Sequence, residues 1–172
     1  FHKEFRESIN VCKACGFHDH LSAQERINFL LDKDTIENIT LPKLKVDPLN
    51  FKDKKKYVDR IKEAQTNTKL EDALLVSFGF LNGIPLIVAC FDFAFMAGSM
   101  GRYVGDGLIK ASDEAIKRKC SLLVIPSSGG ARMQEGIFSL MQMPRTTIAI
   151  NKLKKAKLPY IVLLANPTTG GV

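Results

Sequence analysis

The sequence predicts an α/β fold with a partly parallel sheet over residues 71–172. Two apolar runs, at 73–81 and 84–93, are separated by Asn82-Gly83, a dipeptide that favours the positive φ angles of a type I′ hairpin turn. After this hairpin, helical and strand-like patterns alternate, so the predicted element order is β-β-α-β-α-β. The crossovers are long enough to join parallel strands through right-handed helical connections.

The segments after the hairpin are assigned from their apolar periodicity. A buried strand is expected over 121–126 and a last strand over 159–165. A long helical stretch is expected between them, from the pair Gly129-Gly130 to about Lys157, and Pro144 should kink or interrupt it because proline lacks the amide that a helix interior needs. An earlier helix is indicated by apolar residues at helical spacing, namely Val104, Leu108, Ala111, Ala115 and Ile116.

Residues 1–70 divide into a short polar module, 1–20, and a helical linker region, 21–70. Ser22 and Glu25 stand at capping-box spacing and predict a helix that runs to about residue 32. A second helix is expected to start near Asp53 and to carry three apolar residues on one face, Tyr57, Ile61 and Ala64.

The composition is that of a globular protein, with 45% hydrophobic and 25% charged residues. No apolar stretch approaches the ~18 residues that a membrane helix needs, and the first twenty residues lack the apolar core of a signal peptide. We therefore expect an intracellular protein without a membrane span. The net charge of +7 favours anionic partners, which include nucleic acid, a membrane surface and a phosphorylated ligand such as coenzyme A.

Both ends suggest a piece of a longer protein. The chain begins with Phe1 and not with methionine, and it ends on a turn-rich run, 167–172, directly after a strand-like segment.

The first candidate site is the small-residue run Ser127-Ser128-Gly129-Gly130-Ala131-Arg132, predicted between a buried strand and a helix. Adjacent glycines let the backbone turn sharply and approach a ligand closely. Free amides at a helix N-terminus favour negative charge, as in an oxyanion hole or a phosphate cradle. A tight turn without a ligand explains the two glycines equally well.

The second candidate is Ala97-Gly98-Ser99-Met100-Gly101, which nearly matches the Gly-x-Ser-x-Gly nucleophile elbow of serine hydrolases. That motif needs a histidine later in the chain. All three histidines, His2, His18 and His20, precede Ser99, so the chain order disfavours a hydrolase. The sequence also contains no Walker loop and no Gly-x-Gly-x-x-Gly, which argues against a nucleotide hydrolase and a dinucleotide-binding fold.

The third candidate is the pair Cys12 and Cys15, whose spacing is half of a tetrahedral zinc site. His18 and His20 follow too closely for relaxed chelation, so the other ligand pair is expected before Phe1. Cys90 and Cys120 lie in or beside predicted strands and are expected to be buried, inert thiols.

Together these segments resemble the carboxyltransferase β subunit of the multi-subunit acetyl-CoA carboxylase of bacteria and plastids. The N-terminal matches are Val11-Cys12-x-x-Cys15-Gly16 and Ser22-Ala23-x-Glu25-Arg26-Ile27. Those of the second half are Phe95-Met96-x-Gly98-Ser99-Met100-Gly101, Ser128–Gly136, Ser139–Met143, Leu158–Tyr160 and Pro167–Val172. The similarity covers essentially the whole chain, and the Ser128–Gly136 run together with the terminal Pro-Thr-Thr-Gly-Gly-Val is highly specific.

The resemblance implies a crotonase-like fold of ββα units over 71–172, truncated at its C-terminus and preceded by the second half of a four-cysteine zinc ribbon over 1–20. It implies a cytoplasmic or plastid stromal enzyme that transfers a carboxyl group to acetyl-CoA, forming malonyl-CoA in the first committed step of fatty acid synthesis. The carboxyl group would come from carboxybiotin on biotin carboxyl carrier protein. The implied partner is a carboxyltransferase α subunit in an α2β2 assembly, and the fragment alone is expected to be inactive.

The resemblance also implies roles for individual residues. Gly129 and Gly130 would donate backbone N–H groups to the enolate of acetyl-CoA, as catalytic residues. The acetyl-CoA site would be lined by Phe95, Met96, Gly98, Ser99, Met100, Gly101, Arg132, Thr169, Gly170 and Gly171. Arg132 would order its loop or meet a phosphate, and a structural salt bridge is an equally good explanation for it. Cys12 and Cys15 would bind structural zinc.

Two other functions remain open from the sequence. A related carboxyltransferase acting on another acyl-CoA would share the fold and the glycine loops. A nucleic-acid-binding zinc-ribbon protein would use the basic surface, and its binding would be sensitive to salt. The second alternative leaves the pair Gly129-Gly130 unexplained, so it is kept only as a secondary activity.

Overall fold

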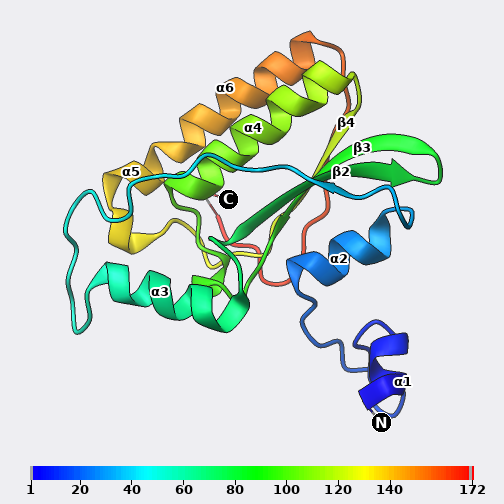
Figure 1. Cartoon of the computed structure of the whole chain (residues 1–172), viewed down its shortest axis with the longest axis horizontal. Helices are drawn as coiled ribbons and strands as arrows, with labels where there is room; N and C mark the ends of the chain where they lie inside the picture. Colours follow the sequence, from blue (N-terminus) through cyan, green and yellow to red (C-terminus); the bar gives the residue numbers. More distant parts are fainter. Residues whose placement is uncertain (1, 171) are drawn as a thin grey trace.

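The computed structural model describes residues 2–170 and 172, and a five-stranded sheet with the order β1-β2-β3-β4-β5 lies at its centre (Figure 1). β1 (Glu37–Asn38) pairs antiparallel with β2 (Leu74–Leu81), which forms an antiparallel hairpin with β3 (Ile84–Phe91). β4 (Ser121–Ile125) and β5 (Tyr160–Val162) then add in parallel. The predicted α/β class and the parallel crossovers are confirmed. β1 was not predicted, because two exposed polar residues carry no strand pattern.

The β2–β3 hairpin has the predicted turn. Asn82 and Gly83 adopt φ angles of 50° and 78°, and Leu81 pairs with Ile84 across the turn. The carboxylate of Asp32 accepts hydrogen bonds from the amides of Asn82 (3.0 Å) and Gly83 (2.9 Å), so a residue far away in the sequence also holds the turn.

The helices cover both faces of the sheet. α4 (Arg102–Arg118) and α6 (Gln142–Lys155) lie side by side on one face, and α2 (Ala23–Leu30) lies on the other (Figure 1). Alternate residues of β3 divide between the two resulting cores, as the period of two of a strand requires. Ile87, Ala89 and Phe91 belong to the α4 side, whereas Leu86, Val88 and Cys90 belong to the α2 side.

The remaining helical elements are short or lie at the rim of the sheet. They are α1 (His2–Glu7), α3 (Tyr57–Thr68), α5 (Ile137–Leu140) and the 3-10 turns η1 (Met96–Gly98) and η2 (Met133–Glu135). In the described part of the chain, no helix has both the length and the apolar character required to span a bilayer.

Two of the N-terminal helices agree with the sequence pattern. Ser22 caps α2 through a complete capping box with Glu25, as predicted. α3 begins at Tyr57, a few residues later than expected, and buries Tyr57, Ile61 and Ala64 on one face as predicted.

The predicted helical stretch after the glycine pair is wrong in two respects. No helix follows Gly130 directly, because Arg132 is extended (ψ 109°) and η2 starts only at Met133. The break between α5 and α6 falls at Met141 and not at Pro144. Pro144 lies in the first turn of α6, where its missing N–H has no helical partner to lose.

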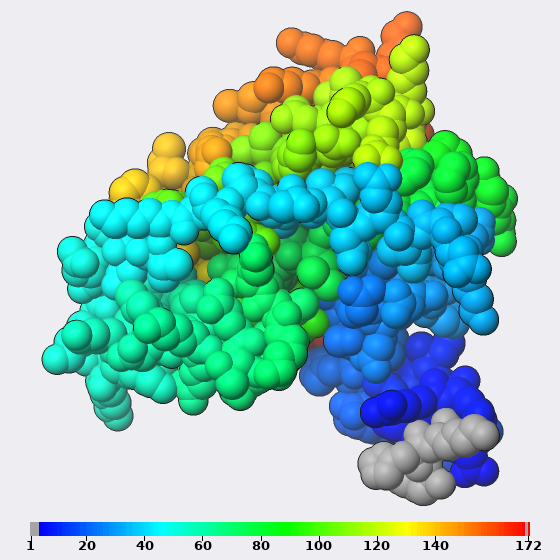
Figure 2. Space-filling view, viewed as in Figure 1, coloured from blue at the N-terminus to red at the C-terminus, as the bar shows by residue number. Residues whose placement is uncertain are grey.

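The segment 21–70 contributes to both cores through α2 and α3 and does not behave as a detached linker. Figure 2 shows the chain around residues 40–55 as a continuous band across one face of the molecule, with residues 2–20 projecting below it. The division into three regions remains a prediction.

Candidate active site

Three loops meet at the carboxyl edge of the parallel strands. They follow β3, β4 and β5, and this edge is where α/β sheets bind ligands. Gly129 N–H donates to the Ala97 carbonyl (2.8 Å) and Met100 N–H to the Gly130 carbonyl (2.9 Å), which joins the first two loops. Thr169 N–H donates to the Ser128 carbonyl (3.1 Å), which adds the third. The structure therefore brings together the predicted segments 95–101, 128–132 and 168–170, while Gly171 lies outside the described residues.

The glycine pair combines an exposed and a buried position. Gly129 is exposed, and a Cβ there would make only ordinary contacts of 3.6 Å with Ala97. Gly130 is buried with a φ of 116°, and its N–H donates to Ser128 Oγ (3.0 Å). Both amides thus have acceptors within the protein, so a ligand oxygen would have to displace or share the Ala97 carbonyl and the Ser128 hydroxyl. The two amides also do not start a helix, contrary to the prediction.

At Gly98 and Gly101, atoms of other segments lie close to the backbone because glycine has no side chain. A Cβ on Gly98, whose φ is 62°, would lie 1.9 Å from the Ser127 carbonyl oxygen. A Cβ on Gly101 would lie 2.6 Å from a carboxylate oxygen of Glu135. Both glycines were predicted to contact substrate, and the structure gives each a reason that does not require one: neighbouring atoms occupy the space of a side chain.

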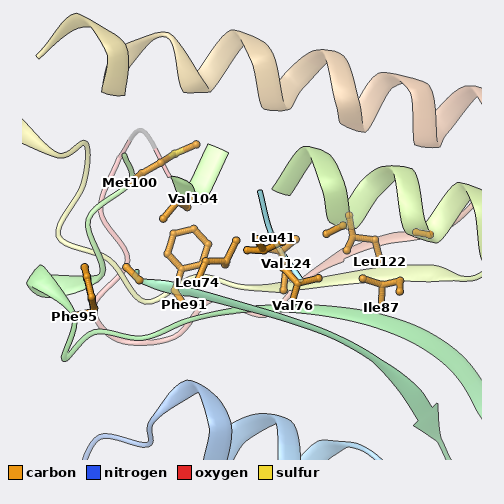
Figure 3. Close-up of a cluster of buried hydrophobic side chains, with 14 of the residues drawn as sticks. Leu41, Leu74, Val76, Ile87, Phe91, Phe95, Met100, Val104, Leu122 and Val124 are labelled. Carbon is orange, nitrogen blue, oxygen red and sulfur yellow. The ribbon is translucent and has the colours of Figure 1, made fainter. Parts of the chain in front are cut away.

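Side chains of the segment 95–101 differ in their access to solvent. Phe95 and Met100 are buried members of the hydrophobic core, in which Figure 3 shows Met100 beside Val104. Met100 also lines an apolar cavity of about 430 Å³ together with Phe91 and Val124. Met96 and Ser99 are half-buried. They line a cavity of about 410 Å³ whose opposite wall is α3, with side chains including Arg60 and Asn67. The sequence pattern gave no indication of this contribution from α3.

Arg132 is the largest fully buried side chain of the described residues, and its guanidinium is completely engaged. It forms a bidentate ion pair with Asp72 (2.6 and 2.7 Å) and donates to Ser99 Oγ (3.0 Å) and the Ser99 carbonyl (2.8 Å). Burial opposes its charge, but the hydrogen bonds and the charge of Asp72 outweigh burial and hold the pKa above its ordinary value. This geometry favours the structural salt bridge over a phosphate contact.

Glu135 and Tyr57 extend this buried network. The Tyr57 hydroxyl donates to Glu135 Oε1 (2.7 Å) and accepts from Arg132 Nη1 (3.2 Å). Glu135 Oε2 accepts from the amide of Arg102 (2.8 Å), the first residue of α4. Burial, above all, raises the pKa of the Tyr57 phenol, so this hydroxyl stays protonated and acts as a donor.

The nucleophile-elbow interpretation of Ser99 gains no support from this geometry. An activating base must accept the proton of the serine hydroxyl. The side chain that contacts Ser99 Oγ is Arg132, which is a donor.

Cys12 and Cys15 lie on one tight turn. Gly16 adopts a φ of 71°, Gly16 N–H donates to the Cys12 carbonyl (2.7 Å), and Cys12 N–H donates to the Phe17 carbonyl (2.8 Å). Amides of Cys15 and Ala14 hold the pKa of the Cys12 thiol below its ordinary value. This donor set fits half of a zinc site, and no group of three or more metal-binding side chains gathers within the described residues.

Chemical labelling should distinguish the two N-terminal cysteines from the two buried cysteines. Burial raises the pKa of Cys90 to about 12, so only about one molecule in 10,000 carries a Cys90 thiolate at pH 8. The pKa of Cys120 is also raised by burial. With a chelator present at pH 8, we expect a thiol reagent to modify Cys12 and Cys15 rapidly, and all four cysteines only in denaturant. Cys90→Ser should leave the native count at two, and a rapidly reacting third thiol in the native protein would contradict the burial.

The match to known proteins extends over the same loops. The model of the carboxyl transferase domain matches residues 43–172, well over half of the chain. The chain belongs to the carboxyl transferase domain family. Among curated relatives, the acetyl-coenzyme A carboxylase carboxyl transferase subunit beta of Mesorhizobium japonicum is 49% identical over 172 residues, which are 100% of this chain and 56% of that protein. The Agrobacterium fabrum protein of the same description is 47% identical, with 100% and 58% covered. This carboxyl transferase chain thus spans about half the length of the curated relatives it matches.

Solved structures of other proteins show the same fold. A transcarboxylase 12S structure, described with hydrolysed methylmalonyl-coenzyme A bound, superposes with a TM-score of 0.67 at 24% identity and covers 94% of this chain and 27% of that one. A Pseudomonas malonate decarboxylase hetero-dimer gives a TM-score of 0.62 at 23% identity, with 86% and 53% covered. At these identities the likeness establishes the fold alone.

Proposed function

We propose that this chain is part of a carboxyltransferase β subunit that transfers a carboxyl group to acetyl-CoA to form malonyl-CoA. The observation that carries the proposal is the meeting of the Gly129-Gly130 pair with the 95–101 and 168–170 loops at the carboxyl edge, in a chain 49% identical to such subunits over its whole length. A related enzyme acting on another acyl-CoA is the second candidate, because the structural neighbours include a methylmalonyl-CoA complex.

The proposed role of the glycine pair is electrostatic. Removal of a proton from the acetyl methyl group places negative charge on the thioester oxygen, and preorganised amides stabilise that charge most in a water-excluded site. Gly129 is exposed and has no side chain, so a ligand can reach the backbone of the glycine pair at this residue. For Gly130 to take part, the substrate oxygen replaces Ser128 Oγ as the acceptor of its N–H. Thr169 and Gly170, both exposed, form the neighbouring wall.

The other components of the reaction belong to the same proposal. Carboxybiotin, carried by biotin carboxyl carrier protein, supplies the carboxyl group, and an α subunit completes the site. The Cys12–Cys15 turn holds one half of a structural zinc site, and its preformed geometry supports this assignment. The working location is the cytoplasm or the plastid stroma.

The test uses the full-length protein purified with its α subunit. Malonyl-CoA formation is measured for the wild type, for Gly129→Ala and for Gly83→Ala as the control. Gly129→Ala fits the backbone with contacts of 3.6 Å, yet its methyl group occupies the exposed approach to the amides. We expect kcat/KM to fall at least about tenfold, because small misplacements of reacting groups have large effects on rate.

Gly83→Ala makes the same chemical change at the opposite end of β3, in the hairpin turn, and should keep the activity of the wild type. Unchanged activity of Gly129→Ala in an assembled complex would exclude the glycine pair as the substrate site. A wild-type complex that carboxylates propionyl-CoA but not acetyl-CoA would favour the second candidate.

A further inference from the structure

We propose that Tyr57 and Asp72, which lie outside the glycine loops, are positioning residues for the carboxyl transfer: acting through Glu135 and Arg132, they set the distance between the 95–101 and 128–132 loops. This inference rests on the proposed function and assigns a task to α3 that no sequence motif indicates.

The network connects parts of the chain that are remote in sequence. Tyr57 is the first residue of α3, and Asp72 precedes β2. Arg132 and Glu135 follow the glycine pair, and Ser99 belongs to the other loop. Every connection is short: Tyr57–Glu135 at 2.7 Å, Arg132–Asp72 at 2.6 Å and Arg132–Ser99 at 2.8 Å.

The two loops contact each other directly at the point that the network clamps. Met100 N–H donates to the Gly130 carbonyl (2.9 Å), and Arg132 N–H donates to the Met100 carbonyl (2.9 Å). Arg132 therefore binds the 95–101 loop twice, through its backbone and through its guanidinium on Ser99. Because Asp72 and Tyr57 fix the guanidinium, a change in either should alter the spacing between the loops.

Charge explains why the network needs all its members. It buries one cation, Arg132, with two carboxylates, Asp72 and Glu135. The two carboxylates share the single cation: Asp72 holds it bidentately, whereas Glu135 Oε1 lies 3.8 Å from Arg132 Nη1 and also accepts from the Tyr57 hydroxyl, with Oε2 accepting from the Arg102 amide at the N-terminus of α4. Loss of one of these donors leaves an oxygen of the buried Glu135 carboxylate without a hydrogen-bond partner. This is unfavourable, so the Glu135 side chain should shift.

Apart from Ser99, which is half-buried and lines the neighbouring cavity, the members of the network are buried. Arg132, Asp72, Glu135 and Tyr57 are all buried, whereas Gly129 and Thr169 are exposed. Loss of a network member should therefore leave substrate binding largely intact and lower the rate of the chemical step, for which the loops must be in register.

The test compares Tyr57→Phe with Tyr103→Phe in the full-length protein purified with its α subunit. Both changes remove one phenolic hydroxyl that hydrogen-bonds a glutamate, but the partner of Tyr103 is the exposed Glu71 (3.3 Å). We expect Tyr57→Phe to lower kcat about tenfold with the KM for acetyl-CoA changed less than about twofold. Tyr103→Phe should change neither constant.

A double-mutant cycle separates positioning from a general loss of stability. Because the Tyr57 hydroxyl acts through both Glu135 and Arg132, the loss of kcat in Tyr57→Phe/Glu135→Gln should be smaller than the product of the two single losses. Multiplied effects, an unchanged kcat for Tyr57→Phe, or a lower melting temperature with both kinetic constants unchanged would each overturn the proposal.

Amide hydrogen exchange tests the positioning role independently of the proposed carboxyl transfer activity. A wild-type complex that forms no malonyl-CoA contradicts the function, and the positioning role is then judged by exchange of the Met100 and Arg132 amides. These amides should exchange at least about tenfold faster in Tyr57→Phe than in Tyr103→Phe if the network clamps the loops. Equal exchange in the two variants would overturn the positioning role.

Discussion

Replacing Gly98 by alanine is expected to lower the free energy of unfolding by about 2–5 kcal/mol, the sum of overpacking and of a left-handed backbone with a side chain. The new Cβ would lie 1.9 Å from the Ser127 carbonyl oxygen, and Gly98 has a φ of 62°. Since the obstacle is backbone, no rotamer change relieves it. The measurement is urea-induced unfolding of the full-length protein, with malonyl-CoA formation followed in parallel.

Gly83→Ala is the matched control for this change. Gly83 has a similar φ of 78°, but its Cβ would meet no atom within 4 Å. Only the conformational cost of about 1–2 kcal/mol should remain. Equal stability of the two variants would contradict the close contact between the Gly98 backbone and the Ser127 carbonyl oxygen.

Replacing Arg132 by methionine should destabilise the protein by about 3–5 kcal/mol, because the change leaves a buried carboxylate without its partner. Asp72 would lose the bidentate ion pair, and Ser99 would lose two donors. Activity should disappear with the register of the loops. Denaturant unfolding and the carboxylation assay together check this expectation.

Two further variants test why Arg132→Met should lose stability. Arg132→Met/Asp72→Leu removes both charges and should be more stable than Arg132→Met alone. Lys55→Met breaks an exposed ion pair with Glu63 and should leave the unfolding midpoint unchanged. A double variant less stable than the single one would contradict the uncompensated charge as the cause.

Features that depend on neighbouring residues were predicted well. The Asn82-Gly83 turn and the Ser22–Glu25 capping box both formed, because a few adjacent residues determine them. The parallel crossovers followed from the lengths of the segments between apolar runs. β1 was missed because Glu37 and Asn38 pair with β2 without any apolar signal.

Residues of the candidate site were found as a group, but their individual environments were not. Phe95 and Met100 are core side chains, and Arg132 is enclosed by partners that the motif does not contain. Asp72 and Tyr57 lie 60 and 75 residues before Arg132, so no local pattern could connect them. The backbone of Arg132 is extended at this point, and the predicted helix does not start after Gly130.

The sequence by itself determined the order of β2, β3, β4 and β5 with their helical crossovers, the turn and cap residues, and the segments that form the candidate site, since periodicity and turn chemistry are local properties. Only the tertiary structure decided which glycine faces solvent, which amides are already donated, and which charges are buried together. Those properties depend on atoms supplied by distant segments: the Ser127 carbonyl opposite Gly98, Glu135 against Gly101, and Asp72 around Arg132.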